Sequence, residues 1–319
     1  MKVKQQMAGK EIIPIFFATD DNYVPYLDVT LASLIENASN DYFYDIHILN
    51  TGLNYFNKFK ISQRDRDNVS IKFDDISKDI EFISKKFQNI YHFSLATYYR
   101  LFIETLFPQY SRILYLDCDI VVLGDISKLW TTDLEGNMVA GVVEGFVAGT
   151  KEFREYAKNA VGLNPDKYIN AGILVIDLDK FRENKVEKNF TELLSTYNFD
   201  TIDPDQCYLN FLCKDKIKYL PCGWNFTSAY NQAEGGMNIV HYALAKKPWQ
   251  FDGVVNEEYF WQYAQKSHFY DEICAFKANF SDELKRKKEQ AGADIIRRAT
   301  EIVASGKTFC SCNLIGAYC

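Results

Sequence analysis

Short apolar runs alternate along the chain with longer stretches in which apolar residues recur every three or four positions. This alternation of strand-length and helix-period segments is typical of a layered α/β fold. The run 12–19 predicts a buried strand, followed by a helix. Strands at 44–50 and 69–73, with a helix around 56–66 between them, complete a βαβαβ start. Because such units bind ligands at the carboxyl ends of their parallel strands, we expect a ligand near residues 20–23.

The rest of the chain adds further strands and a long charged segment. The segment 93–107 has apolar residues at helical spacing and stops before a proline, so it predicts a helix. The strand 112–116 runs directly into Asp117-Cys118-Asp119, and a second apolar run follows at 120–123. Four later strands are predicted at 138–143, 171–176, 217–220 and 239–242. From about residue 280 the chain becomes charged with one apolar side, which predicts a helical appendage.

The composition is that of a globular protein without the charge of a nucleic-acid binder. The 319 residues carry 36 basic and 43 acidic side chains, a net charge of −7, so we expect no nucleic-acid partner. No apolar run approaches the roughly 18 residues that a membrane helix needs. The stretch 12–18 is too short, and too soon followed by acidic residues, to be a signal peptide. These features predict a cytoplasmic protein whose eight cysteines are reduced thiols.

The tail over 280–319 differs from the rest because its basic residues outnumber its acidic ones, seven to five. Two interpretations stay open. Its basic helix rests peripherally on the anionic inner face of the cell membrane, or it is a solvated helix that covers the core. Cys310, Cys312 and Cys319 would need a fourth ligand to bind zinc, and no histidine lies near them in the sequence.

Asp117 and Asp119 form the candidate centre of a site. The chain has four Asp-x-Asp triplets, but only this one lies between two apolar runs. Alternate residues of an extended segment point to one face, so the two carboxylates would form an oxygen-rich pocket for a divalent cation. Burial of two like charges is unfavourable unless a cation or hydrogen bonds offset it, which favours a metal site over a structural pair.

His241 is the candidate third ligand, because it ends the apolar run 239–240 and shortly precedes Lys247. Taken alone, such a histidine is more often a hydrogen-bonded core residue. Two carboxylates and an imidazole suit Mn²⁺ better than Mg²⁺, which is the alternative ion. Three protein ligands leave open positions for phosphate oxygens, and Lys247 would add positive charge for a diphosphate. The chain lacks the G-x-x-x-x-G-K-[ST] and G-x-G-x-x-G loops, which counts against a P-loop enzyme and a dinucleotide oxidoreductase.

Six segments, in order along residues 12–249, together resemble glycosyltransferase family 8. They are FATDDNY from Phe17, NIYH leading to YYRL at Leu101, LYLDCDIVVLGDISKLW from Leu114, YINAGILVIDL from Tyr168, DPDQCYLN from Asp203 and HYALAKKPW from His241. The resemblance implies an α/β protein of the GT-A fold, a Rossmann-like nucleotide-binding mixed sheet flanked by helices, here with a C-terminal helical appendage. It divides the chain into a loosely ordered or disordered N-terminus over 1–10, a GT-A domain over 11–279 and a basic helical tail over 280–319.

The resemblance also implies roles for the donor-binding residues. The uracil and ribose of a UDP-sugar would be held by Ala18, Asp20, Asn22 and Tyr23. The Tyr23 ring would stack on the base, whereas Asp20 or Asn22 could instead cap a helix. The family's Mn²⁺ would be bound by Asp117, Asp119 and His241, and its diphosphate neutralised by Lys247.

The residues around the transferred sugar follow from the same resemblance. Arg100 would reach the donor sugar or diphosphate, or else be a solvated helix charge. Asn170 and Asp205 would hold sugar hydroxyls, and Gln206 would lie beside the anomeric carbon. His92 would face the acceptor or the closed donor site, with a hydrogen bond at a helix entry as the alternative.

Two positions depart from the family pattern. Leu244 replaces the usual glycine three residues after the histidine, which puts a close backbone approach to phosphate in doubt. Cys207 replaces an acid that often follows Gln206, which weakens a double displacement at that position.

The predicted activity is transfer of a hexose from UDP-glucose or UDP-galactose to a hydroxyl of a glycan or glycolipid acceptor, with retention at the anomeric carbon. The family's bacterial members suggest surface glycan synthesis of the lipopolysaccharide or capsule type. Because Gln206 is a poor nucleophile, same-face attack is favoured. The alternative is a non-catalytic nucleotide-sugar binding protein of the same fold. A sugar nucleotidyltransferase ranks last, since residues 20–23 are acidic where that class has a glycine-rich basic loop.

Overall fold

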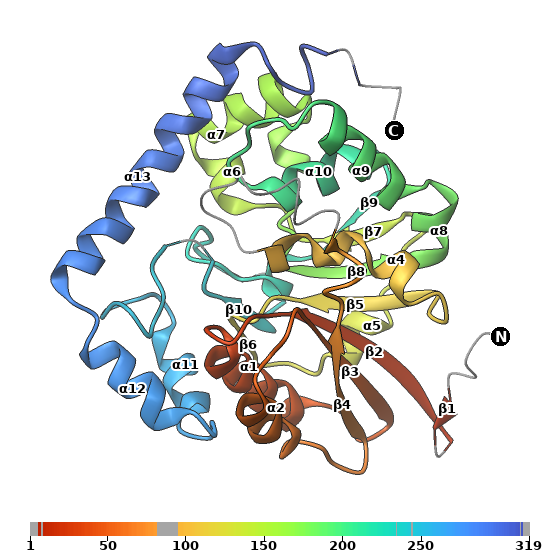
Figure 1. Ribbon diagram of the computed structural model, residues 1–319, viewed down its shortest axis with the longest axis vertical. Helices are drawn as coiled ribbons and strands as arrows, with labels where there is room; N and C mark the ends of the chain where they lie inside the picture. The colour runs from red at the N-terminus through yellow and green to blue at the C-terminus, as the bar shows by residue number, and fades with distance from the viewer. Residues whose placement is uncertain are drawn as a thin grey trace.

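The computed structural model describes residues 6–7, 9–81, 95–233, 235–243, 245–312 and 314. Its centre is an eight-stranded sheet in the order β4-β3-β2-β5-β8-β7-β9, with β1 paired to β2 (Figure 1). The strands are β1 (Gln6–Met7), β2 (Lys10–Ala18), β3 (Tyr42–Asn50), β4 (Val69–Asp75), β5 (Arg112–Leu116), β7 (Val139–Gly141), β8 (Ile173–Asp177) and β9 (Ile217–Tyr219). Strands β2 to β5 run parallel, whereas β8 is antiparallel to β5 and β7. The predicted mixed sheet and its βαβαβ start are confirmed.

A second, two-stranded sheet joins β6 (Ile120–Val122) to β10 (Ile239–His241) in antiparallel register. The apolar run after Asp119 therefore leaves the central sheet instead of extending β5. In this register His241 lies opposite Ile120. Two segments from opposite halves of the chain thus meet beside the end of β5.

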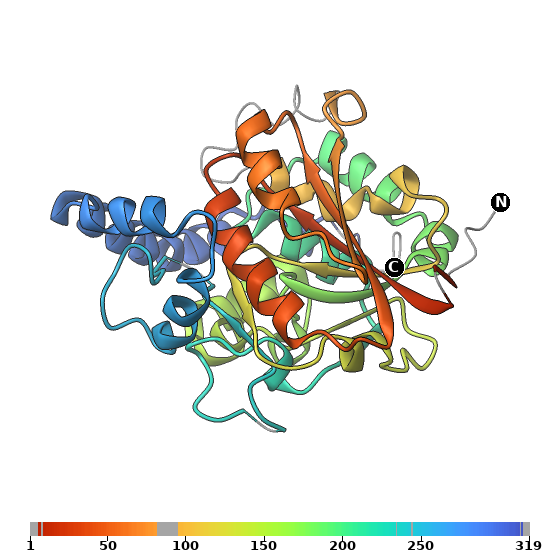
Figure 2. The same cartoon turned by 90° about the horizontal axis from the view of Figure 1, so that it is seen from below.

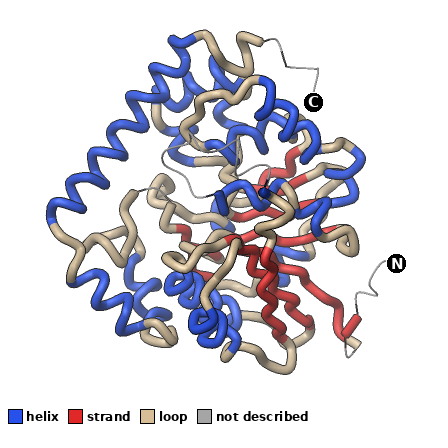
Figure 3. The backbone as a smooth tube through the Cα atoms, viewed as in Figure 1, coloured by secondary structure: helices blue, strands red, loops and turns tan. Residues whose placement is uncertain are grey.

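Helices lie on both sides of the central sheet (Figure 3). The strands therefore separate two apolar cores. On β2 the side chains of Ile13, Ile15 and Phe17 belong to one core and that of Phe16 to the other, as the two-residue period of a strand requires. The first core lies against α1 (Val24–Asn37), α2 (Tyr55–Ser62), α5 (Ser127–Trp130), α11 (Glu257–Ala264) and α12 (Tyr270–Ala278). The second lies against α4 (Ile103–Leu106), α6 (Gly145–Gly149), α7 (Lys151–Tyr156), α8 (Leu178–Glu183), α9 (Val186–Thr196) and α10 (Pro204–Leu212).

The prediction of one helix over 93–107 is wrong for its described part. Leu95–Leu101 forms a 3₁₀ helix, η1, and α4 is a separate short helix. Tyr98, Tyr99 and Arg100 are all buried. Consecutive side chains of a 3₁₀ helix point in directions about 120° apart, and different neighbours bury them: Tyr98 packs on Phe190, and Tyr99 bonds to Thr51. The other short helical turns are η2 (Ala157–Val161), η3 (Pro165–Lys167) and η4 (Cys222–Trp224).

A buried ion pair fastens α1 to the region around α11 and α12. Asp28 is fully buried on α1, and Arg64 donates to both of its carboxylate oxygens. Ser267 and the backbone N–H of His268 also donate to Asp28, at 2.8 and 2.7 Å. Because every donor points at one carboxylate, this residue links three segments of the chain.

The C-terminal segment forms one long helix, α13 (Asp282–Ser305), which runs along one edge of the molecule from α12 to α7 (Figures 1 and 2). Its second half is anchored, since Ala299 and Ile302 are buried against the second core. Beyond it, Phe309 packs on Phe199, Tyr208 and Phe211 at ring distances of 4.3 to 5.0 Å. The helical character of this segment is confirmed, while the division at residue 280 stays a prediction.

Several sequence predictions concern features that are absent or undescribed. Among the described residues, no helix combines the length and the apolar character needed to cross a bilayer. In the same part of the chain Cys310 and Cys312 are free thiols and belong to no metal-ligand cluster. His92, Leu244 and Cys319 lie outside the described residues.

Candidate active site

The Asp117-Cys118-Asp119 loop lies between β5 and β6 at the carboxyl ends of the parallel strands. Helix α1 contacts this loop through Thr30, whose hydroxyl lies 2.9 and 2.7 Å from the carbonyl oxygens of Cys118 and Ile120. The Asp117 N–H donates to the Gly172 carbonyl at 2.7 Å, and the Asp119 carbonyl accepts from the Tyr242 N–H at 3.0 Å. The backbone of both aspartates is therefore fixed by neighbouring segments.

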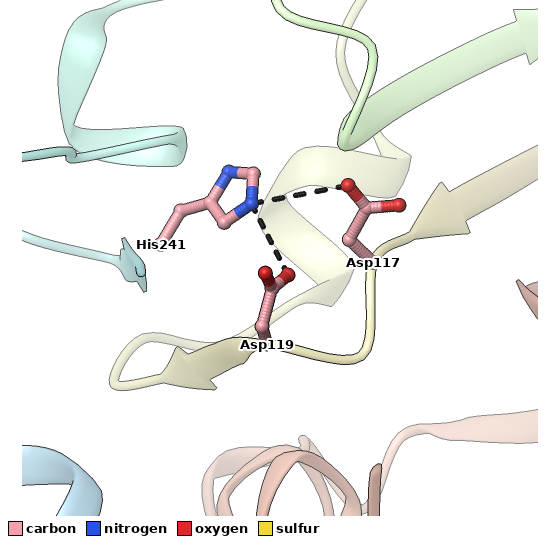
Figure 4. A group of neighbouring side chains, drawn as sticks. All are labelled: Asp117, Asp119 and His241. Atoms are coloured by element: carbon pink, nitrogen blue, oxygen red, sulfur yellow. Dashed lines mark ion pairs between the residues drawn. The ribbon is translucent and has the colours of Figure 1, made fainter. Parts of the chain in front are cut away.

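Asp117, Asp119 and His241 converge as the sequence predicted (Figure 4). Their potential ligand atoms lie within 4.8 Å of one another. The His241 Nε2 lies 3.2 Å from Asp119 Oδ1 and 3.8 Å from Asp117 Oδ2. Two carboxylates and one imidazole nitrogen form a donor set that fits Mn²⁺, and this is the one such cluster among the described residues.

Two buried cations hold the other oxygen of each carboxylate. Arg100 Nη2 lies 3.0 Å from Asp117 Oδ1, and Lys247 Nζ lies 2.6 Å from Asp119 Oδ2. Arg100 is 5% exposed and also pairs with Asp205 at 3.2 Å, so it is not a solvated helix charge. Burial opposes ionisation of Asp119, but Lys247 and His241 hold its pKa well below the usual value. One carboxylate oxygen of each aspartate is thus left facing His241.

The far side of the His241 ring is held by a chain of buried amides that the sequence did not reveal. The His241 Nδ1 donates to Asn225 Oδ1 at 2.8 Å, so Nε2 is the ring nitrogen that faces the aspartates. The Asn225 Nδ2 donates to Asn170 Oδ1 at 2.8 Å, and Asn170 donates to Glu144. Burial raises the pKa of Glu144 above its usual value. In the sequence Glu144 directly follows the predicted strand 138–143, just as Asp117 follows β5. This position at the end of a strand is the feature from which Glu144 could have been predicted as a site residue.

Gly172 is a second residue that the sequence analysis did not single out. A Cβ atom at this position would lie 2.5 Å from Asp117 Oδ2 and 2.6 Å from His241 Cε1. Any side chain would therefore displace two of the three clustered residues. The glycine lets β8 begin directly against the site.

The start of α10 supplies the next group of polar residues. Arg100 binds Asp205, and burial raises the pKa of this aspartate to about 6. Burial likewise raises the pKa of Asp203 to about 7, although Tyr168 donates to its Oδ2 at 2.7 Å. Two hydrogen bonds fix the side chain of Gln206: its Oε1 accepts from the Ala171 N–H at 3.0 Å, and its Nε2 donates to Asp203 at 2.9 Å. Cys207 is fully buried and points into the second core.

A cavity of about 570 Å³ joins these groups. Its polar lining includes Arg100, Asp117, Asp119, Asn170, Asp205 and Gln206. Of the donor-site residues predicted near the end of β2, Tyr23 lines the cavity together with Lys247, whereas Ala18, Asp20 and Asn22 do not. Asp20 Oδ1 accepts from the N–H groups of Asn22 and Tyr23 at 2.9 and 3.2 Å, which closes a turn just before α1. The N-cap of α1 is Tyr23 and no side chain caps it, so neither Asp20 nor Asn22 is a helix cap.

Comparison with known proteins agrees with this arrangement. Residues 14–253 match the family model described as Glycosyl transferase family 8. The chain belongs to glycosyltransferase family 8. Among the family's relatives, a putative glycosyltransferase of Haemophilus influenzae is 30% identical over 217 residues, or 67% of this chain and 63% of that protein. This chain thus spans less than two thirds of that relative.

Two further relatives carry more specific names. The lipopolysaccharide 1,2-glucosyltransferase of Escherichia coli is 27% identical over 267 residues, which cover 75% of this chain and 73% of that protein. A solved structure of the galactosyltransferase LgtC, in complex with donor and acceptor sugar analogs, has a TM-score of 0.67 and 27% identity, and covers 80% of this chain and 96% of that one. The GT-A fold implied by the sequence is thereby confirmed.

Proposed function

We propose that this protein transfers a hexose, glucose or galactose, from a UDP-sugar to an acceptor hydroxyl with retention at the anomeric carbon. The observation that carries the proposal is the convergence of Asp117, Asp119 and His241 beside Lys247 and Arg100 in one cavity. Such a site gathers anionic ligands for a divalent ion and cations for phosphate oxygens in the same place. Membership of glycosyltransferase family 8 supports the same activity.

In this proposal the donor spans the cavity from Tyr23 to Gln206. The Tyr23 ring, 37% exposed, offers a stacking surface for uracil, and Ala18, Asp20 and Asn22 would contact the base and ribose from the adjacent turn. Lys247 would bind the diphosphate, and Arg100 would hold the aspartates and reach the donor. Asn170 and Asp205 would contact the sugar hydroxyls. A divalent ion, Mn²⁺ or the alternative Mg²⁺, bound by Asp117, Asp119 and His241 would neutralise charge developing on the diphosphate.

The proposed reaction is a same-face substitution. The bond between the anomeric carbon and the phosphate oxygen breaks, UDP leaves with the electron pair, the acceptor oxygen bonds to the same face, and its proton passes to the departing phosphate. Gln206 is committed to Ala171 and Asp203 and is a poor nucleophile. Position 207 offers no carboxylate and faces the core. Gln206 and Cys207 therefore favour this route over a covalent intermediate at either position.

The proposed acceptor is a glycan or glycolipid of bacterial surface polysaccharide, because relatives include a lipopolysaccharide glucosyltransferase. Peripheral contact with the inner face of the membrane is part of the proposal, since the basic residues of the first half of α13 are largely exposed. Two of them already pair with acidic neighbours, Lys285 with Asp282 and Lys287 with Glu283. Release of the protein from vesicles containing phosphatidylserine at low salt would contradict this contact.

The direct test is a panel of UDP-glucose and UDP-galactose with Mn²⁺, read as UDP release, followed by NMR of the product. We expect one donor to be turned over and the new linkage to retain the donor's anomeric configuration. An inverted linkage would contradict the mechanism. A protein that binds UDP but releases none from any donor, in water or with acceptor, would instead be the non-catalytic nucleotide-sugar binding protein of the same fold.

A further inference from the structure

Part of the cavity wall comes from outside the matched family region. The family match ends at residue 253, whereas α13 begins at Asp282. Six α13 residues nevertheless line the cavity: Lys288, Ala291, Gly292, Asp294, Ile295 and Arg298. Part of the cavity wall is thus supplied by a segment that the family match does not cover.

Helix α13 extends along the cavity from the proposed phosphate side to the proposed sugar side. At its first half, Gly292 approaches the loop after β10, where a Cβ atom would lie 3.9 Å from Ala245, and Glu289 pairs with Lys246 at 3.1 Å. At its second half, Arg298 pairs with Asp200 just before α10. Ile295 lies between these points and packs on the second core. Ile295 therefore faces the same end of the cavity as Asp205 and Gln206.

That end of the cavity combines an apolar wall with carboxylates. Its apolar lining consists of Phe146, Val147, Phe153, Ile202 and Ile295. The acidic lining residues at this end are Asp203, Asp205 and Asp294, of which Asp205 pairs with Arg100 and Asp294 with Arg297. The cation Arg298 is likewise paired, with Asp200. Aromatic and aliphatic surfaces suit the apolar face of a sugar ring. Arg100 and Arg298, the lining cations at this end, are already committed to carboxylates, so an anionic acceptor gains no new ion pair here.

We propose that the α13 wall and the Phe146–Phe153 side form the acceptor subsite, which accepts the ring of an uncharged saccharide. This inference rests on the proposed function, because it takes the donor to occupy the Tyr23 to Gln206 part of the cavity. Ile295 sets the depth of the subsite. Acceptor selection by this chain is therefore encoded partly beyond the family region.

The test uses paired substitutions on one helix. Ile295→Trp fills the cavity, whereas Ile296→Trp places the same side chain on the outward face, where Ile296 is 40% exposed. The acceptor probes are p-nitrophenyl β-glucoside, β-galactoside and β-N-acetylglucosaminide, with p-nitrophenyl β-glucuronide as the charged counterpart. UDP release is measured with each probe and with water alone, which reports the donor half of the site separately.

We expect at least one neutral probe to accelerate UDP release by the wild type, and the glucuronide to be at least about tenfold poorer in kcat/KM. In Ile295→Trp the acceptor KM should rise at least about tenfold, while donor KM and hydrolysis in water stay within about twofold. Ile296→Trp should match the wild type. Ile295→Ala, which adds no bulk, covers the case in which the tryptophan variant fails to fold, and should raise the acceptor KM about threefold through lost apolar contact.

The inference is overturned if Ile295→Trp and Ile296→Trp have equal acceptor KM values, if Ile295→Ala leaves that KM unchanged, or if the glucuronide is used as well as the neutral probes. It is also overturned if no neutral probe exceeds water while donor hydrolysis persists. That last result leaves the proposed donor chemistry standing. Absence of hydrolysis and of transfer together would instead remove the proposed function.

Discussion

Asn225 is the residue whose replacement tests how the candidate metal site is held. It is 1% exposed, its Oδ1 accepts from His241 Nδ1 at 2.8 Å, and its Nδ2 donates to Asn170 at 2.8 Å. In Asn225→Ala the buried Nδ1–H loses its acceptor, which costs about 1–3 kcal/mol. Asn170 keeps a second donor, the Gly172 N–H at 2.8 Å. The damage should therefore concentrate on the orientation and tautomer of His241.

Loss of such an orienting partner typically lowers metal affinity about 10–100-fold, which equals about 1.4–2.8 kcal/mol of binding free energy. We expect Asn225→Ala to weaken Mn²⁺ binding by this amount, measured by titration followed through the EPR signal of the free ion. Asn225→Asp keeps an acceptor for Nδ1–H, so its Mn²⁺ affinity should stay within about threefold of the wild type or exceed it.

The matched control is Asn50→Ala, which removes another fully buried amide that bonds only within β3, β4 and the following turn. It should lower the free energy of unfolding without changing Mn²⁺ affinity. Wild-type Mn²⁺ affinity in Asn225→Ala, or an equal loss in Asn50→Ala, would refute the assignment of Asn225 as the residue that positions His241.

Three further predictions concern other parts of the molecule. Asp28→Asn leaves Arg64 buried without its carboxylate and should lower the free energy of unfolding in urea by about 3–5 kcal/mol, whereas Glu36→Gln, at an exposed pair with Lys266, should change it by less than about 1 kcal/mol. Burial raises the pKa of Glu104 from 4.5 to about 7, so between these pH values the native state binds a proton that the unfolded state has lost. The free energy of unfolding should therefore fall as pH rises from about 4.5 to 7. Glu104→Gln should make the urea midpoint less dependent on pH in this range, and an unchanged dependence would contradict the prediction. Lys247→Met should lower kcat for UDP release at least about tenfold at saturating Mn²⁺, and unchanged turnover would exclude Lys247 from the phosphate contacts.

The sequence predicted the parts of the site that follow strands. Asp117 and Asp119 were recognisable because they interrupt a buried apolar run, and His241 because it ends another. The family resemblance added Arg100 and Gln206, whose side chains the structure places in the same cavity. The βαβαβ start was predictable because two-residue and helical periods are local properties of the chain.

The rest depends on contacts between distant segments. Asn225 gains its role only because it meets Asn170 and His241 in space, and Gly172 only because Asp117 and His241 crowd its Cα. The charged helix α13 was predicted as an appendage from its composition, and only its path along the cavity shows that Ile295 lines the site. The three consecutive buried side chains of η1 meet neighbours that are distant in the sequence, such as Phe190 and Thr51, which no periodicity rule anticipates.

Metal-restored turnover is the most direct test of the claim that Asp117, Asp119 and His241 hold an ion for a UDP-sugar. After EDTA treatment, the wild type should release no UDP above the blank, and added Mn²⁺ should restore release. At saturating Mn²⁺, Asp117→Asn should remain at least about 100-fold slower, while Asp67→Asn, in an exposed Asp-x-Asp triplet, should match the wild type. Full UDP release without divalent ions, or by Asp117→Asn, would contradict the account.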